Sequence, residues 1–170
     1  MSRSNPGKPK PRTTRATAQI VCEGFTEEAF CKHLRGLYGR DCGVRVAIHN
    51  ARGGSPQDII QAALRRSGYD RTAVLLDGDK PLAESWRKKA CAAGHLLLIS
   101  NPCFEVLLLE ILGRPVPETT AACKKALESI LPGNSKCDFR SYSSHFPQAL
   151  LASCKLPHLQ ALLALFQPDA

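Results

Sequence analysis

The sequence predicts an α/β fold, in which a mostly parallel four-stranded sheet is flanked by helices. Between residues 18 and 112, short and almost continuously apolar runs alternate with segments whose apolar residues recur at helical spacing. Strands that are apolar on both faces are typical of parallel sheets covered by helices on each side. After residue 115 only helical patterns remain. We therefore expect an α/β core over residues 18–115, followed by a helical C-terminal extension of the same domain over residues 116–170.

The first half of the core is expected to contain two strand–helix units. Their strands and helices cover residues 18–22, 27–38, 44–48 and 56–68, in that order. The strands are short runs of apolar or β-branched residues, and the helices carry apolar residues three or four positions apart. Thr26 is expected to cap the first helix, because its hydroxyl can accept a hydrogen bond from a backbone N–H. Pro56 suits the first position of the second helix, where no N–H is needed.

The second half of the core repeats this alternation. Its expected strands and helices cover residues 72–76, 82–93, 95–100 and 101–112, in that order. Gly94 and Gly113 are expected to end the two helices, because glycine readily adopts the backbone conformation found just beyond a helix. Asn101 either caps the last helix ahead of Pro102 or contributes to a functional site.

Both ends of the chain differ from this core. Residues 1–17 hold three prolines and five Lys or Arg side chains but almost no bulky apolar residue, which predicts a disordered basic tail. This tail either settles on phosphate groups or only keeps the protein in solution. In the C-terminal extension, helices are expected over residues 119–131, 144–152 and 157–166, with a polar loop over residues 134–141.

Composition narrows the class of protein. The formal net charge is +8 and the pI about 9.2, which favours a polyanionic partner such as DNA or RNA. The eight cysteines form no C-x-x-C pair, and no His stands at finger spacing from a Cys pair, so a zinc site is disfavoured. We see no signal peptide and no apolar run long enough to cross a membrane, so we expect a cytoplasmic protein with reduced thiols and no membrane partner. The oligomeric state is left open.

Three carboxylates follow two of the expected strands. Glu23 comes directly after the first strand, and Asp77 and Asp79 come directly after the third. Because the carboxyl ends of parallel strands meet at one edge of a sheet, we expect these side chains to lie together. Such an anionic cluster repels itself unless protons or a cation neutralise it, and its oxygen atoms suit Mg²⁺ or Mn²⁺. An acidic cluster on a basic protein points to metal-dependent phosphate chemistry on nucleic acid, with these three acids as candidate catalytic residues.

Further residues are candidates for the same site. Glu105 lies in the first turn of the last core helix, where it either completes the carboxylate cluster or only interacts with the helix N-terminus. Lys80, next to Asp79, either contacts a phosphate group or pairs with the acids. Arg52 begins a Gly-rich turn before a helix, and such turns can bind phosphate. Together with Asn101, Lys80 and Arg52 are the candidate substrate-binding residues.

These residues resemble the motifs of the Toprim domain, the metal-dependent fold of topoisomerases, primases and overcoming-lysogenization-defect (OLD) nucleases. The matching residues are Glu23-Gly24 after the first strand and Asp77-Gly78-Asp79 after a later one. Within that superfamily, the chain is most similar to the RloB-like group. This narrower resemblance rests on residues 20–27, 76–79 and 100–109, and it covers about residues 18–112. RloB-like proteins are associated with restriction and phage-defence loci, some of them beside an ATPase gene.

The resemblance implies roles for particular acids. In Toprim nucleases, the glutamate matching Glu23 ligates a metal or acts in acid/base chemistry, and the pair matching Asp77 and Asp79 holds Mg²⁺. In OLD-type nucleases, a second acid four residues after that glutamate also binds metal, and Glu27 occupies that position. Glu105 is the further candidate ligand.

The function that the resemblance implies is hydrolysis of phosphodiester bonds by a Toprim-type nuclease that depends on Mg²⁺, or on Mn²⁺ in its place, in anti-phage defence. The substrate is DNA or RNA, and an ATPase is the candidate partner protein. The alternative is a non-catalytic nucleic-acid-binding or regulatory subunit that docks on such an ATPase. Strand passage or polymerisation is disfavoured, because the chain is short and its tyrosines lack an evident nucleophilic setting.

Overall fold

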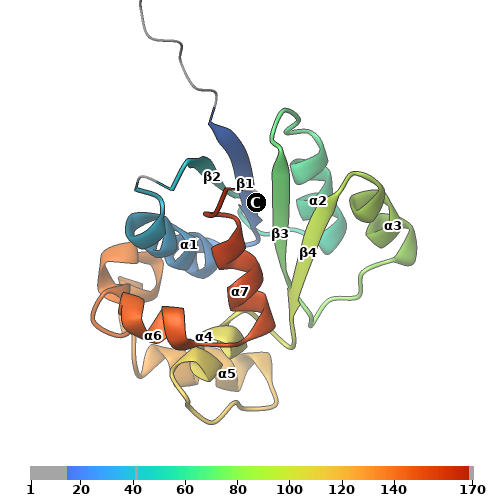
Figure 1. Cartoon of the computed structure of the whole chain (residues 1–170). Coiled ribbons are helices and arrows are strands. Elements are labelled where there is room, and N and C mark those ends of the chain that lie inside the picture. The colour runs from blue at the N-terminus through green and yellow to red at the C-terminus, as the bar shows by residue number, and fades with distance from the viewer. Residues whose placement is uncertain (1–14, 41, 169–170) are drawn as a thin grey trace, which may run out of the picture.

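A four-stranded sheet forms the centre of the molecule in a computed structural model that describes residues 15–40 and 42–168. All neighbouring strands are parallel, in the order β2-β1-β3-β4 (Figure 1). The strands are β1 (Ala16–Cys22), β2 (Val44–Asn50), β3 (Arg71–Asp77) and β4 (His95–Ser100). The expected α/β class with a parallel four-stranded sheet is therefore confirmed, and each strand lies within two residues of its expected bounds.

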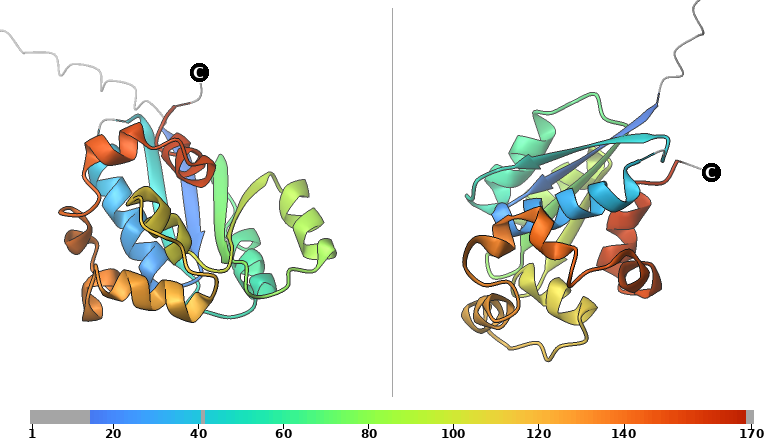
Figure 2. Two further views of the ribbon diagram at one scale, coloured as in Figure 1. Left: turned by 90° about the horizontal axis from the view of Figure 1, so that it is seen from below. Right: turned by 90° about the vertical axis from the view of Figure 1, so that its left-hand side faces the viewer.

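Helices cover both faces of the sheet. The α-helices are α1 (Phe25–Tyr38), α2 (Pro56–Leu64), α3 (Glu84–Ala92), α4 (Glu105–Ile111), α5 (Thr120–Glu128), α6 (Gln148–Ser153) and α7 (Pro157–Ala164). Two short 3-10 helices, η1 (Gly133–Cys137) and η2 (Phe139–Tyr142), lie between α5 and α6. Helices α2 and α3 pack on one face, whereas α1 and the C-terminal helices lie on the other (Figure 2).

The alternation of side chains along each strand divides the buried residues between these two faces. Val21 and Val74 belong to a smaller core with Ile59 of α2. Ile20 and Leu75, each one residue away along its strand, belong to the larger core on the opposite face. The central strands are therefore apolar on both faces because helices cover both faces, as the sequence pattern predicted.

The C-terminal residues contribute to the larger core. Tyr142 is fully buried, and its ring centroid lies 5.8 Å from that of Phe30 and 5.5 Å from that of Phe146. Its hydroxyl donates a hydrogen bond of 2.8 Å to the Lys136 carbonyl oxygen, so the polar end of the side chain is satisfied. Phe166, beyond α7, is part of the same cluster. The helical extension thus packs on α1 and α4 and shares their core.

The expected start of α2 is confirmed, whereas the expected cap of α1 is wrong. Pro56 does begin α2, and Ser55 caps that helix through a reciprocal capping box. The expectation that Thr26 caps the first helix is wrong, because α1 already begins at Phe25. Gly24 occupies the N-cap position without a side-chain hydrogen bond, so Thr26 lies inside the first turn.

Two further expectations about local structure are also wrong. Asn101 does not cap a helix, since α4 begins only at Glu105 and Phe104 precedes it without a side-chain cap. The Asn101–Pro102 peptide bond is cis, and both residues lie in the turn between β4 and α4. Residues 134–141, expected as a polar loop, instead fold largely into η1 and η2.

At the start of the described chain, Ala16 and Thr17 belong to β1, although we expected them in the basic tail. The Asp70 carboxylate holds the start of β1 in place. Its Oδ2 accepts one hydrogen bond of 2.7 Å from the Thr17 N–H and another of 2.8 Å from the Thr17 hydroxyl. Residues 1–14 of the expected tail lie outside the described residues, so their disorder stays a prediction. Among the helices of the described residues, none is long and apolar enough to cross a membrane.

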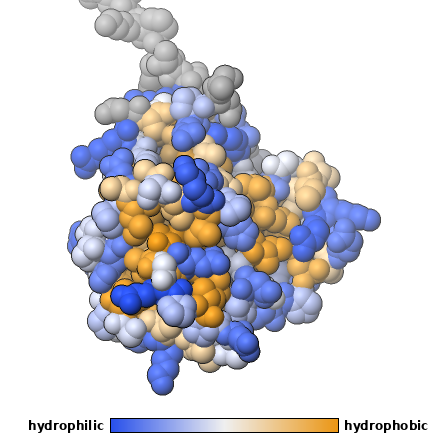
Figure 3. Space-filling view, turned by 60° about the horizontal axis from the view of Figure 1, so that its bottom comes forward, coloured by the Kyte–Doolittle hydropathy of each residue, from blue (hydrophilic) through white to orange (hydrophobic). Residues whose placement is uncertain are grey.

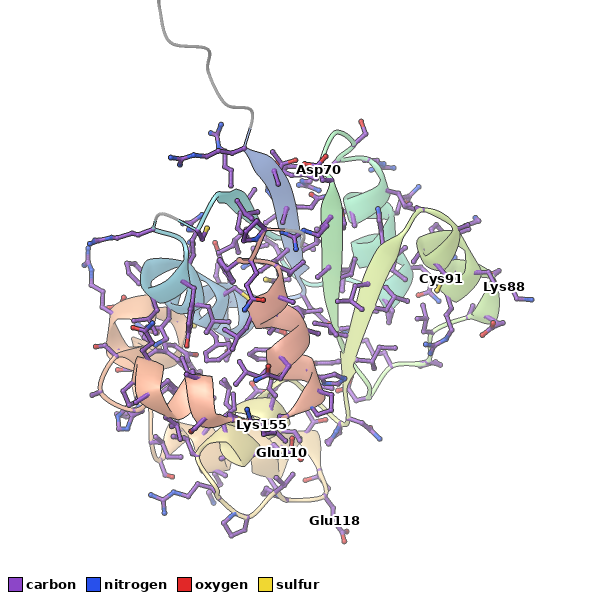
Figure 4. All side chains as sticks on the ribbon, viewed as in Figure 1. Asp70, Lys88, Cys91, Glu110, Glu118 and Lys155 are labelled. Carbon is purple, nitrogen blue, oxygen red and sulfur yellow. The ribbon has the colours of Figure 1, made fainter. Side chains whose placement is uncertain are left out.

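The parallel sheet gives the molecule two different edges. The C-terminal ends of the strands meet at one edge, where Glu23 follows β1 and Asp77 ends β3. Asp70 lies before β3 at the other edge, and Figure 4 shows it at the opposite end of the molecule from Glu110 and Glu118. Acidic residues thus occur on several sides, and only some of them follow the strand ends where ligands of such sheets bind.

Candidate active site

Four carboxylates line one cavity at the C-terminal edge of the sheet. Glu23 follows β1, Asp77 ends β3, Glu27 lies in the first turn of α1 and Glu105 begins α4. The cavity measures about 400 Å³ and all four residues line it. Each of the four is buried, with at most 9% of its surface exposed. The structure therefore brings together four of the five acids that the sequence singled out.

Backbone hydrogen bonds to these carboxylates tie three elements to one another. Glu23 Oε2 accepts a hydrogen bond of 3.3 Å from the Asp77 N–H, which joins the end of β1 to the end of β3. Asp77 Oδ1 accepts a hydrogen bond of 2.9 Å from the Phe104 N–H, directly before α4. The orientation of both carboxylates is therefore fixed by the main chain.

Two glycines allow the chain to pass closely around the cluster. A Cβ atom on Gly24 would lie 3.2 Å from Glu27 Oε2, so a larger residue there would displace this carboxylate. A Cβ atom on Gly78 would lie 3.1 Å from the Ser100 carbonyl oxygen and from Asn101 Cα. The Gly78 N–H donates a hydrogen bond of 2.8 Å to the same Ser100 oxygen, which holds the turn after β3 against the end of β4.

Burial and mutual repulsion raise the pKa values of two of these carboxylates. For Glu27, burial has the largest effect, and the nearby carboxylates of Asp77, Glu105 and Glu23 add to it, so that its pKa is about 7. For Asp77, burial again comes first and Glu23 and Glu105 add to it, and its pKa is about 6 despite the hydrogen bond from Phe104. Without a cation, the cluster therefore holds protons at a pH at which ordinary carboxylates have lost them.

Glu28, the next residue after Glu27, shows what an ordinary acid in this helix turn looks like. It pairs with Lys32 at 2.6 Å and accepts a hydrogen bond of 2.8 Å from the Asn50 amide. Burial acts to raise its pKa, but these hydrogen bonds outweigh burial and leave the pKa below the ordinary value. Glu28 points to its own partners outside the cavity lining, whereas Glu27 faces the other carboxylates.

Lys80 contacts the cluster from the turn after β3. Its Nζ lies 2.8 Å from Glu23 Oε1 and also donates a hydrogen bond of 3.0 Å to the Gly54 carbonyl oxygen. The hydrogen bond to Glu23 is the main reason that the pKa of Lys80 is raised above its ordinary value. Lys80 therefore pairs with an acid in this structure, and its contact with a phosphate group stays a prediction.

Two cations, Arg52 and Lys124, line the cavity itself. Arg52 reaches it from the turn between β2 and α2, where its φ angle of 62° places the backbone in the left-handed region. Lys124 reaches it from α5, and its charge acts to lower the pKa of Asp77. The sequence analysis missed Lys124, because α5 belongs to the helical extension and no motif or strand end marks this residue. Only packing of the extension beside the sheet edge shows that it belongs here.

Besides Lys80, which lines a neighbouring hollow, two predicted site residues lie outside the lining of this cavity. Asp79 is exposed, its N–H donates a hydrogen bond of 3.0 Å to the Pro102 carbonyl oxygen, and its Oδ2 accepts one of 3.3 Å from the Thr120 hydroxyl. Asn101 is exposed and lines a neighbouring hollow with Glu110 and other residues of β4 and α4. Their roles as metal ligand and substrate contact stay predictions.

The four carboxylates suit a hard divalent cation in kind, because each offers only oxygen atoms. In the part of the chain that the structure describes, no group of three or more His, Cys, Asp or Glu side chains already has an arrangement that could hold a metal ion. Repulsion between carboxylates opposes such an arrangement unless protons or a cation neutralise it. The donor atoms therefore suit Mg²⁺ or Mn²⁺ in kind, and binding of either ion stays a prediction.

No family model and no curated protein matches the chain. Two solved structures of the C-terminal region of the Xanthomonas campestris pv. campestris OLD protein, one phased with mercury and one with iodine, are similar to it. The TM-scores are 0.35 and 0.36, at 15% and 16% sequence identity, and each match covers 88% of this chain and 93% of that chain. The structural likeness to the OLD protein is thus weak, and membership of the RloB-like group stays a prediction.

Proposed function

We propose that this protein is a Toprim-type nuclease that uses Mg²⁺ to hydrolyse phosphodiester bonds. The observation that carries the proposal is the grouping of Glu23, Glu27, Asp77 and Glu105 around one cavity at the strand ends. Within the described residues, Lys80 is the only cation in an ion pair with any of the four. Burying four carboxylates with one such partner is unfavourable for stability, and this cost is typical of sites that bind a cation.

The residues divide into two groups by their proposed roles. Those that would hold the metal are Glu23, Glu27, Asp77 and Glu105, with Asp79 as a further expected ligand. The metal would polarise a phosphoryl oxygen and lower the pKa of a water molecule bound to it. Arg52 and Lys124 would bind and orient substrate phosphate oxygens, since both are exposed cations on the cavity wall. Lys80 would hold Glu23 in position through its ion pair.

The proposed setting is anti-phage defence in the cytoplasm, with DNA or RNA as the substrate and an ATPase as a partner protein. Support for this setting comes from the resemblance of residues 20–27, 76–79 and 100–109 to the RloB-like group and from the net charge of +8. A net positive charge attracts nucleic acid to the protein, and the acidic cavity is where a metal would act on it.

A cleavage assay with purified protein tests the proposal. Single-stranded DNA, duplex DNA, single-stranded RNA and duplex RNA are each supplied separately. We expect the protein to cleave at least one of them when Mg²⁺ or Mn²⁺ is present. Excess EDTA should stop the reaction, and renewed Mg²⁺ should restore it, because the metal supplies the catalysis. Cleavage that continues unchanged in EDTA would rule out the proposed chemistry.

The alternative of a non-catalytic subunit has one specific observation in its favour. The Lys80 ammonium group already occupies one oxygen of Glu23, and the described acids are not yet arranged as a metal site. A protein that binds nucleic acid and co-purifies with an ATPase, but gives no heat with Mg²⁺ or Mn²⁺ in calorimetry, would favour this alternative over a nuclease.

A further inference from the structure

The wall of the carboxylate cavity carries an exposed aromatic ring. Phe25, the first residue of α1, has 57% of its surface exposed and lines the cavity together with the four acids. Among the described residues, the other exposed large hydrophobic side chains are Leu96, Val116 and Phe139, and each of them is less exposed. The most exposed apolar side chain thus lies beside the proposed catalytic groups.

The ring of Phe25 is free to accept a partner. Phe139 is 39% exposed, but Arg140 lies over its ring at 5.6 Å from the centroid. Within the described part of the chain, no aromatic ring and no cation contacts the ring of Phe25. Leaving a phenylalanine in water forgoes the gain from burying it, which is about 1.5–3 kcal/mol for a large apolar side chain. A ligand that covers the ring would recover part of this gain.

Cations line two hollows that share Asp77. Arg52 and Lys124 line the cavity that contains Phe25. Asp77 also lines a second hollow of about 190 Å³, and this hollow is lined by Lys80 and Arg87. Figure 3, which brings the bottom of Figure 1 forward, shows hydrophobic patches next to strongly hydrophilic side chains on this side of the molecule. A polyanion that crosses Asp77 would therefore meet cations before and after it.

We infer that Phe25 is a stacking platform for a base of single-stranded nucleic acid, and that the substrate is unpaired at the proposed catalytic site. An unpaired strand can lay the face of a base on an aromatic ring while cations follow its phosphates, which is the usual way in which proteins bind single strands. In a duplex each base face is covered by its neighbours, so stacking on a protein ring first requires unstacking of the duplex, which costs a few kcal/mol per base step. The inference rests on the proposed function, since it names the form of the substrate for the same cavity.

Binding measured without cleavage tests the platform. An Asp77→Asn background without added divalent ions keeps the oligonucleotides intact, and fluorescence anisotropy compares a labelled single strand with its duplex, as DNA and as RNA. We expect Phe25→Ala to weaken single-strand binding by about 5- to 100-fold and to leave duplex binding unchanged, because stacking on one base is lost. Phe25→Trp should restore single-strand binding, since a larger ring also stacks.

Leu96→Ala is the matched control, because Leu96 is also an exposed apolar residue, 40% exposed, but lies near the start of β4 at the other edge of the sheet. It should leave binding unchanged. Absence of single-strand binding, or binding that Phe25→Ala leaves intact, overturns the platform. If Mg²⁺-dependent cleavage is nevertheless seen, the nuclease proposal survives that result. Conversely, if Phe25→Ala weakens single-strand binding as expected while the native protein cuts no polymer, the platform stands and the nuclease proposal fails.

Discussion

Asp77→Asn is expected to abolish Mg²⁺-dependent cleavage while the protein stays folded. Asp77 ends β3 and lines both hollows. The asparagine side chain therefore replaces a charged ligand of the proposed metal site by a neutral amide. A loss of several kcal/mol of transition-state stabilisation corresponds to a rate at least about 1,000-fold lower. The asparagine oxygen can still accept the hydrogen bond from the Phe104 N–H, so the local fold should persist.

The control for this variant is Glu118→Gln, which also replaces a carboxylate by an amide but at an exposed position outside the site cavity. We expect its cleavage rate to equal that of the native protein, and circular dichroism should show that both variants are folded. Cleavage by Asp77→Asn at the native rate would contradict the assignment of Asp77. An equal loss in Glu118→Gln would show that the assay reports general damage.

Glu27→Gln is expected to stabilise the metal-free protein at neutral pH. The folded pKa of Glu27 is about 7, well above the ordinary value of 4.5, because of burial and the facing carboxylates of Asp77, Glu105 and Glu23. Between pH 4.5 and 7 the folded state keeps a proton that the unfolded state has lost, so the free energy of unfolding falls as pH rises through this window. Removing the charge should raise that free energy by roughly 3 kcal/mol above pH 7.

Urea unfolding in EDTA at several pH values measures this effect. The curves for native protein and Glu27→Gln should diverge as pH rises from 4.5 to 7 and then run parallel, because the native carboxylate is charged above that range. Glu28→Gln is the matched control one residue away, and it should destabilise slightly, since it loses the ion pair with Lys32 and the Asn50 hydrogen bond. Destabilisation by Glu27→Gln at neutral pH would contradict the proposed repulsion.

The sheet could be predicted from the sequence because its strands are short apolar runs separated by helical segments. In a parallel sheet the order of elements then determines that Glu23 and Asp77 meet at one edge, whatever the order of the strands. Glu27 and Glu105 lie at the same edge, because Glu27 is in the first turn of the helix that follows β1 and Glu105 begins the helix that follows β4. The positions of these four acids at one edge therefore depend only on the order of strands and helices along the chain.

Other parts of the site depend on tertiary contacts that no local pattern reveals. Lys124 reaches the cavity only because α5 packs on α4. The sequence of α5 is that of an ordinary polar helix. Asn101 has the residue type of an N-cap, yet the chain turns at Asn101–Pro102 and delays α4 until Glu105. Tyr142 lies in a polar stretch but is buried, because Phe30 and Phe146 enclose its ring.

The central claim is that these carboxylates form a divalent cation site, and anomalous diffraction from crystals soaked with Mn²⁺ tests it most directly. We predict an anomalous peak in the cavity, with oxygen atoms of Asp77 and of at least two of Glu23, Glu27 and Glu105 at about 2.0–2.2 Å. Asp77→Asn crystals treated in the same way should lack this peak. A cavity without a peak at saturating Mn²⁺, or a peak bound by other residues alone, would contradict the claim.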